Sequence, residues 1–218
     1  MTTAPSFIEL VSIVNWIQDK TAGITFRKVD RRVQMATGCL DLAIEHQSGI
    51  AVLFDQQRVG SAFALMRPLV DSFIRGVWLS RCASEEGLDK FQQGRLGKKH
   101  SFASLVVDVE SFLGKRDTAL SRLTGRSWNF MSDFTHTGFE HVTRRHSATH
   151  LGPNYPPAEI EQMIRSACTI GLLATVELVD LAGDRNLAQA CKQRLTAFVA
   201  TRAPDNAAAG CGSNRTPD

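Results

Sequence analysis

The chain offers little from which a metal framework or a disulfide scaffold could be built. Its 218 residues include five cysteines, at positions 39, 82, 168, 191 and 211, and no two of them form a CxxC pair. Structural zinc sites use closely spaced ligand pairs, so this scatter excludes a zinc framework. An odd, dispersed set predicts reduced and mostly buried thiols, as in a cytoplasmic protein.

Long apolar runs are also missing. The longest, residues 170–183, reads IGLLATVELVDLAG and is interrupted by Glu177 and Asp180. A helix that crosses a bilayer needs about 20 mostly apolar residues, so this run is too short and too charged. The first 16 residues lack the basic region and the small-residue cleavage site of a secretory signal. The sequence therefore predicts a cytoplasmic protein with no membrane segment.

The common motifs of cofactor and metal enzymes are absent as well. No GxGxxG, Walker loop or GxSxG sequence occurs. His146 and His150 are four residues apart, but no Glu follows the first of them, so the HExxH pattern is missing. We therefore predict no metal and no cofactor. The net charge of +3 neither requires nor excludes a nucleic-acid partner, because a mildly basic surface attracts polyanions only weakly.

What the sequence does contain is helical periodicity along most of its length. Apolar residues recur at helical spacing from about 27 to 57 and from about 60 to 82, and residues 156–183 begin with proline and end with glycine. Residues 126–146 are predicted to form one further helix, and GPNYPP, residues 152–157, to interrupt the helices. The sequence predicts an all-α fold, a single bundle of long antiparallel helices over residues 1–202, with a disordered tail at 203–218.

One predicted helix carries an unexpected line of charge. In ALMRPLVDSFIRGVW, residues 64–78, Arg67, Asp71 and Arg75 are each four residues apart and share one side of the helix. Asp followed by Arg at this spacing favours an ion pair. The stripe is either solvated surface or the partner of a second helix, which would bury its charges in pairs. Pro68 lacks an amide donor and so frees a carbonyl on the preceding turn.

The best candidate for a facing helix is SWNFMSDFTHTGFEH, residues 127–141, because it presents an aromatic face with small hydroxyls and one histidine. We predict that the two stripes line one polar pocket that binds a small anion or a nucleotide. Its predicted residues are Arg67, Asp71, Arg75, Trp128, Ser132 and His136. The alternative is that the cluster only holds the bundle together, with His136 as a hydrogen-bonded structural histidine.

These two stretches, LMRPLVDSFIRGVWL and WNFMSDFTHTG, resemble segments of an uncharacterised group of bacterial all-helical proteins. Proteins of this type are distantly similar to HEPN helical bundles, many of which are toxin ribonucleases or components of RNA processing and phage defence. The resemblance implies a helical bundle, a defence or toxin-associated role and a homodimer, since a basic groove is easily built across a two-fold axis.

HEPN ribonucleases also carry an Arg that is followed a few residues later by a His. RHSATH, residues 145–150, supplies Arg145 and His150 in this form. The resemblance therefore implies an alternative function, a metal-independent endoribonuclease acting on RNA. RLGKKH gives Arg95 and His100 the same spacing, so the pattern is weakly specific, and RHSATH departs from the family pattern by ending directly before the 152–157 break.

Overall fold

The computed structural model describes residues 5–97, 100–112 and 128–200, and the predicted tail at 203–218 lies outside these ranges. The described residues form an all-α structure, which confirms the predicted fold class. The β-type pairing within them is one isolated bridge, between His146 and Leu151. The helices are α1 (Pro5–Thr21), α2 (Arg31–Asp55), α3 (Val59–Arg81), α4 (Glu85–Gln92), α5 (Phe102–Phe112), α7 (Phe139–Thr143), α8 (Pro157–Ala182) and α9 (Arg185–Ala200), together with a helical segment at 128–135.

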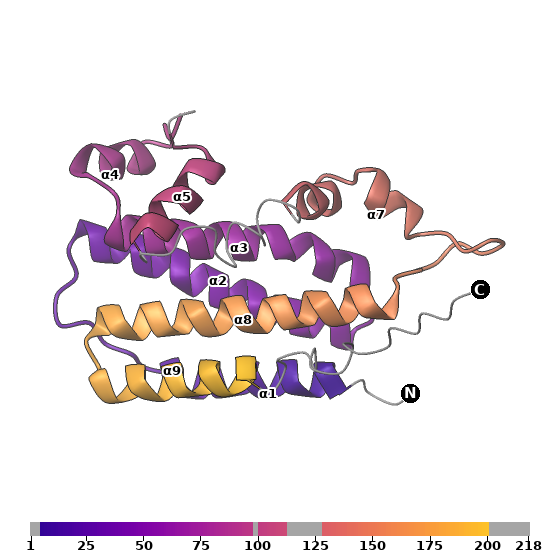
Figure 1. Cartoon of the computed structure of the whole chain (residues 1–218), viewed down its shortest axis with the longest axis horizontal. Coiled ribbons are helices and arrows are strands. Elements are labelled where there is room, and N and C mark those ends of the chain that lie inside the picture. The colour runs from indigo at the N-terminus through magenta and orange to yellow at the C-terminus, as the bar shows by residue number, and fades with distance from the viewer. Residues whose placement is uncertain (1–4, 98–99, 113–127, 201–218) are drawn as a thin grey trace, which may run out of the picture.

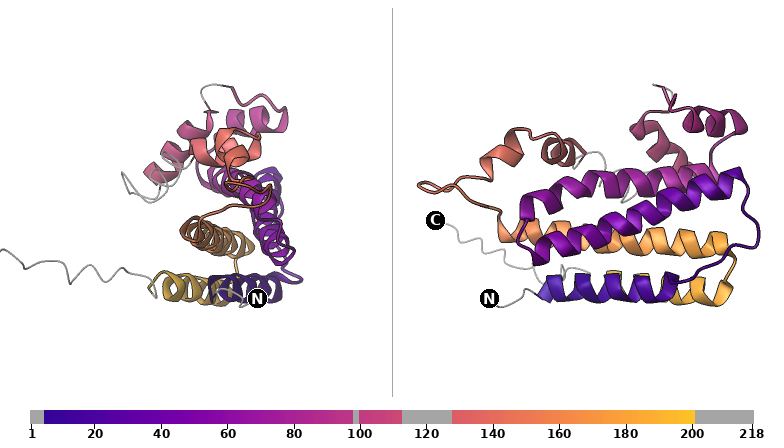
Figure 2. Two further views of the ribbon diagram at one scale, coloured as in Figure 1. Left: turned by 90° about the vertical axis from the view of Figure 1, so that its right-hand side faces the viewer. Right: turned by 180° about the vertical axis from the view of Figure 1, so that it is seen from behind.

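The long helices stack in layers around α8 (Figure 1). α1 and α9 form the layer on one side of α8, and the antiparallel pair α2 and α3 packs on the other, as the two further views show (Figure 2). The short helices lie on the outer face of α3. α4 and α5 lie near its C-terminal end, and α7 lies near its N-terminal end (Figure 1).

The inner face of α3 explains why its charged stripe is available for other contacts. The side chains at the expected three- and four-residue spacing are buried, namely Ala62, Met66, Leu69, Phe73 and Val77. Burial of this face against the long helices leaves Arg67 on the side that meets the short segments covering α3.

Among the described helices, α2, α4 and α9 have a side-chain cap at the N-terminus, whereas α3, α7 and α8 do not. Asp30, Ser84 and Asp184 each accept a hydrogen bond from a backbone amide three residues further on, which caps α2, α4 and α9. Gly183, with φ of +79°, ends α8 in the left-handed conformation that glycine favours. Arg58, which precedes α3, makes no capping hydrogen bond. The first amides of α3 therefore have no side-chain partner of this kind.

The predicted single helix over residues 126–146 is wrong, because the chain turns between residue 135 and α7. Thr137 has φ of +57°, in the left-handed region, and Gly138 follows it. The Asp133 carboxylate lies so close to Gly138 that a Cβ at that position would collide with it. The same carboxylate accepts a hydrogen bond from the backbone amide of Glu140. This turn sets α7 apart as a separate short helix.

A loop of residues 144–156 leaves α7, projects beyond the bundle and returns to α8 (Figure 2). Arg144 anchors it. The guanidinium pairs with Glu140 at 2.6 Å and with Glu159 at 2.7 Å, and it lies over the rings of Phe130 and Phe134. Because Glu159 belongs to α8, this one side chain ties α7 to the first turn of α8.

Candidate anion-binding site

Arg67 on α3 contacts the segment that packs over it. Its Nη1 lies 2.9 Å from Nε2 of His136, and its guanidinium lies 4.7 Å from the centre of the Trp128 ring. A guanidinium can only donate, so Nε2 of His136 is the acceptor in this contact. Trp128 in turn stacks on Phe102 of α5. The structure thus brings together Arg67, Trp128 and His136 of the predicted pocket.

The other predicted pocket residues are arranged differently. Asp71 accepts a hydrogen bond from Nε of Arg75 at 2.8 Å, and both side chains are about one-third exposed. Ser132 is half-buried. Among the described residues, no hydrogen bond or ion pair links Asp71 or Arg75 to the segment 128–136. The contacts of Arg67 therefore connect α3 to the segment at 128–136. The partly exposed ion pair of Asp71 and Arg75 lies beside them on α3.

Thr135 also connects this segment to α3, at the position where Pro68 interrupts the backbone hydrogen bonds of α3. Pro68 has no amide proton, so the carbonyl of Ala64, four residues earlier, lacks its helical donor. The hydroxyl of Thr135 lies 3.1 Å from that carbonyl oxygen and 3.0 Å from the carbonyl of Met131 in its own helix. The carbonyl that the sequence leaves unpaired is thus met by a donor from the covering segment.

Arg145 and His150 both lie in the 144–156 loop, and both are exposed. Nδ1 of His150 lies 2.7 Å from the hydroxyl of Thr149, its neighbour in the chain. Within the described part of the chain, no hydrogen bond or ion pair joins Arg145 to His150. Arg145 instead lines a cavity at the start of α3.

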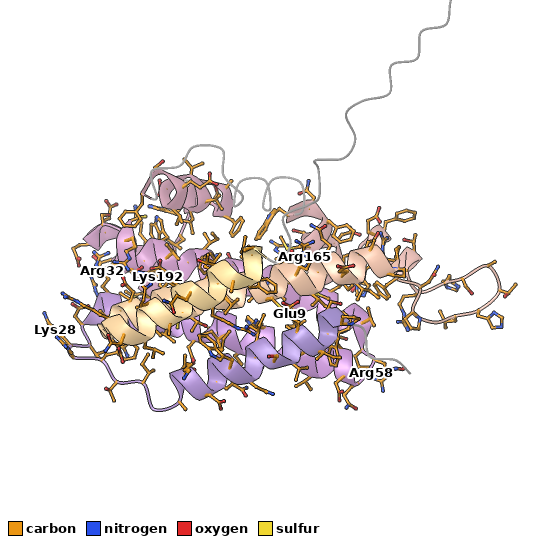
Figure 3. The ribbon with its side chains drawn as sticks, turned by 60° about the horizontal axis from the view of Figure 1, so that its bottom comes forward. Glu9, Lys28, Arg32, Arg58, Arg165 and Lys192 are labelled. Atoms are coloured by element: carbon orange, nitrogen blue, oxygen red, sulfur yellow. The ribbon has the colours of Figure 1, made fainter. Side chains whose placement is uncertain are left out.

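This cavity, of about 520 Å³, lies at the end of the bundle from which the 144–156 loop projects. Figure 3, in which Arg58 is labelled, shows that residue at the same end. Because α3 is 23 residues long and starts here, its unpaired first amides and the positive end of its dipole face this region. The lining residues are Gln57, Arg58, Gly60, Ser61, His141, Arg145 and Pro153.

Two buried polar groups lie beside Gly60, at the start of α3. Tyr155 is 8% exposed, and its hydroxyl makes no hydrogen bond within the described residues. Nδ1 of His141 is also buried without a partner there. Both side chains press against Gly60, where a Cβ would lie 2.7 Å from Oη of Tyr155 and 2.8 Å from Nε2 of His141. Buried polar groups are rarely left unpaired, so these two indicate a place for a ligand or an ordered water.

Aromatic stacking fixes the position of both groups. The ring of Tyr155 lies 5.1 Å from that of Phe63, and the imidazole of His141 lies 4.9 Å from the ring of Phe134. Phe63 and Phe134 stack on each other at 4.9 Å. The phenol and the imidazole are therefore held by the core itself, which preorganises them.

The cavity is positively charged. Neither Arg58 nor Arg145 makes an ion pair within the described residues, and no carboxylate is among the residues that line the cavity. Burial raises the pKa of the Tyr155 hydroxyl, and the charge of Arg145 offsets part of that rise. The phenol is therefore a protonated donor at neutral pH. A cavity that is lined by two arginines without ion pairs, at an uncapped helix N-terminus, suits an anion.

A family model described as a family of unknown function (DUF6988) matches residues 40–202. The chain belongs to this family. The matched region contains α3, α7 and the 144–156 loop, so every residue that lines the cavity falls within the DUF6988 region. No curated protein and no solved structure matches the chain. The resemblance to HEPN bundles therefore stays a prediction.

Sequence reasoning missed most of this cavity within the DUF6988 region. Gly60 marks a turn in the sequence and Tyr155 belongs to the 152–157 break, and neither role indicates a ligand. One signal was present, because residues 141–158 contain two arginines and three histidines but no Asp or Glu. This signal cannot be interpreted without the fold, because the sequence does not show which helix end the positively charged stretch approaches.

The described residues offer no candidate site for metal binding or for thiol chemistry. No group of three or more His, Cys, Asp or Glu side chains in them could hold a metal ion. Cys39 and Cys82 are free, and burial raises the pKa of each thiol to about 11, so neither is a ready thiolate nucleophile. Among the described helices, none is long and apolar enough to cross a bilayer.

Proposed function

We propose that this protein binds a small oxyanion of the phosphate class, free or as part of a nucleotide, in the cavity at the start of α3. The observation that carries the proposal is the convergence on Gly60 of an uncapped helix N-terminus and the unpartnered phenol of Tyr155. Helix N-termini favour anions because their amides point at the ligand and the dipole is positive there.

The charged side chains strengthen this case. Arg58 comes from the turn before α3 and Arg145 from the 144–156 loop, so two cations from distant parts of the chain line one cavity. Guanidinium groups bind phosphate oxygens in a fixed, bidentate geometry. The predicted anion site thus keeps its ligand class but moves from Arg67 and His136, whose groups are engaged with each other, to the cavity lined by Arg145.

Calorimetric titration with inorganic phosphate tests the proposal. Arg58→Gln and Arg145→Gln are each expected to weaken binding by about tenfold or more, which corresponds to about 1.4 kcal/mol. Arg165→Gln is the matched control, because it removes one exposed arginine from α8, away from the cavity (Figure 3). The control should bind phosphate within about twofold of the original protein. Absence of binding, or equal losses in all three variants, would overturn the proposal.

A metal-independent endoribonuclease is the alternative function, and the presence of Arg145 in the lining of this cavity favours it. The exposed position of His150 and its contact with Thr149 give that residue no comparable support. RNA cleavage by the purified protein in EDTA, beside the Arg145→Ala/His150→Ala variant, decides the question. Cleavage that persists unchanged in the double variant would exclude these two residues.

The defence or toxin-associated role and the homodimer rest on the HEPN resemblance alone and remain proposals. Light scattering at high protein concentration tests the dimer directly. A monomer mass would count against it and against an RNA groove built across a two-fold axis.

A further inference from the structure

We infer that the protein has a second binding site, for a small uncharged aromatic molecule, in an apolar cavity between α3, the segment at 128–135 and the first half of α8. This apolar cavity has a volume of about 410 Å³ and shares no lining residue with the cavity at the start of α3. The inference goes beyond the proposed function and does not depend on it. The depth of the cavity, its side chains and the charge at its mouth each support it.

The apolar cavity reaches into the core of the protein. The large apolar side chains that line it are Phe63, Met66, Phe130, Met131, Phe134 and Met163. All of these except Phe130 are at most 8% exposed. The exposed residues Ala158 and Gln162 also line the cavity, so it opens to solvent beside the first turns of α8. Apolar cavities stay dry and take up aromatic molecules, and sites for small organic ligands measure about 300–1,000 Å³.

Three phenylalanines form a fixed part of the wall. The ring centre of Phe134 lies 4.9 Å from that of Phe63 and 4.7 Å from that of Phe130. The guanidinium of Arg144 lies over Phe130 and Phe134, and it is bonded to Glu159 of α8. The rings are therefore held in place without a ligand, so a ligand that packs against them loses little free energy in ordering them.

Three methionines form the rest of the buried wall, and they are three of the five in the chain. Met66 comes from α3, Met131 from the segment at 128–135 and Met163 from α8. A methionine side chain adjusts to the shape of a ligand, and its sulfur makes favourable contacts with aromatic rings. Contacts of a ligand with sulfur atoms and rings add to simple apolar burial only when the ligand is aromatic. The wall therefore favours an aromatic ring over a saturated ring or an alkyl chain.

The mouth of the apolar cavity disfavours an anion. Glu159 is the charged side chain among the described residues that line the cavity, and its carboxylate accepts hydrogen bonds of 2.8 and 2.7 Å from Arg144. Arg144 also pairs with Glu140, so two carboxylates share one guanidinium. A charge of either sign cannot enter the buried part, because phenylalanine and methionine offer it no polar partner. The ligand is therefore uncharged.

Calorimetric titration of the full chain with five probes tests the inference. Naphthol is uncharged and aromatic, decahydronaphthol is its saturated analogue, and decanol is an open chain with the same number of carbon atoms. Naphthoate is an anion and naphthylmethylamine a cation at neutral pH. Naphthol should bind with a negative change in heat capacity, which reports the burial of apolar surface. The other four probes should each bind at least about tenfold more weakly.

Ser166→Phe fills the apolar cavity from α8. Ser166 is half-buried and lines the cavity, and its hydroxyl bonds the carbonyl of Gln162. The new ring occupies the space of the ligand, so naphthol should bind at least about tenfold more weakly, while the melting temperature stays equal or rises. Thr169→Phe is the matched control, because Thr169 is also half-buried on α8 and bonds the carbonyl of Arg165, but it does not line the cavity. The control should bind naphthol within about twofold of the original protein.

Met131→Leu supplies a readout that a general disturbance of the cavity would not give. Leucine and methionine exchange with little change in volume, so the fold is kept. Loss of the sulfur should weaken the binding of naphthol about threefold and leave that of decahydronaphthol within about twofold. Equal weakening of both probes would show that the methionine only shapes the cavity, and it would count against an aromatic ligand.

Three further results would overturn the inference. They are the absence of naphthol binding, equal losses in Ser166→Phe and Thr169→Phe, and an affinity for any of the other four probes that equals that for naphthol. Phosphate binding by Ser166→Phe should stay within about twofold of that by the original protein, because the two cavities share no lining residue. Failure of this inference and failure of the proposed function therefore give different results.

Discussion

Replacing Thr135 by valine removes the hydroxyl that meets the carbonyl of Ala64, and we expect this change to destabilise the fold by about 1–2 kcal/mol. A neutral hydrogen bond contributes about 0.5–1.5 kcal/mol net, and an acceptor left unpaired in the interior costs about 1–3 kcal/mol. Ala64 is half-buried, which places the expected cost in the lower part of that range. Urea denaturation followed by circular dichroism measures it.

The cause can be isolated with a second substitution. Pro68→Ala restores the amide that normally bonds the Ala64 carbonyl, so Thr135→Val should then cost less than about 0.5 kcal/mol. The remaining hydroxyl contact, to Met131, lies within its own helix. The two substitutions should therefore couple by about 1 kcal/mol in a double-mutant cycle.

Thr37→Val is the matched control for this cycle. Thr37 is also half-buried, and its hydroxyl bonds carbonyls of its own helix, those of Val33 and Gln34. Its replacement should cost the same with and without Pro68. The reasoning fails if Thr135→Val costs equally much in both backgrounds, because the hydroxyl would then not be replacing the missing amide of α3.

Three other features give further predictions. Gln47 is fully buried and neither atom of its amide has a partner in the described structure, so Gln47→Leu should stabilise the fold by about 1–2 kcal/mol in urea; a loss would contradict this. Burial lowers the pKa of His46 below 6.5 despite Glu45, so the folded state binds fewer protons and stability falls as the pH drops through about 6.5. His46→Gln should flatten the fall in melting temperature from about pH 7.5 to 5.5, and an unchanged slope would count against it. Because their pKa values are raised to about 11, Cys39 and Cys82 should alkylate much more slowly at pH 8 than in the unfolded chain, as peptide mass spectrometry can show; equal rates would refute it.

The long helices were predictable because their signals are local. Gly60 and the apolar spacing of residues 62–77 predict a helix from about 60 to 82, and α3 spans Val59–Arg81. Pro157 and Gly183 likewise mark the two ends of α8. Such signals act within a few residues of the helix that they define, so a single sequence is enough to recognise them.

The turn at 136–138 and the cavity were not predictable in the same way. The apolar spacing continues across Thr137, but Asp133 folds back on Gly138 and ends the helix by a side-chain contact. The cavity requires Tyr155 to meet Gly60, residues that are distant in the chain. Contacts of this kind follow from how helices pack, and periodicity in one segment contains no information about them.

The cavity at the start of α3 also depends on the ion pair that Arg144 makes with Glu159 of α8. The walls come from two distant stretches, residues 57–61 and 141–153, and Arg144 fastens the second stretch to α8. In any local opening that releases Arg144, His141 and Arg145 move away from Gly60 and the cavity no longer exists. The measured affinity is then the intrinsic affinity multiplied by the closed fraction. A bound ligand must in return suppress that opening, so hydrogen exchange of the α7 amides should slow on binding while exchange in the centre of α8 does not.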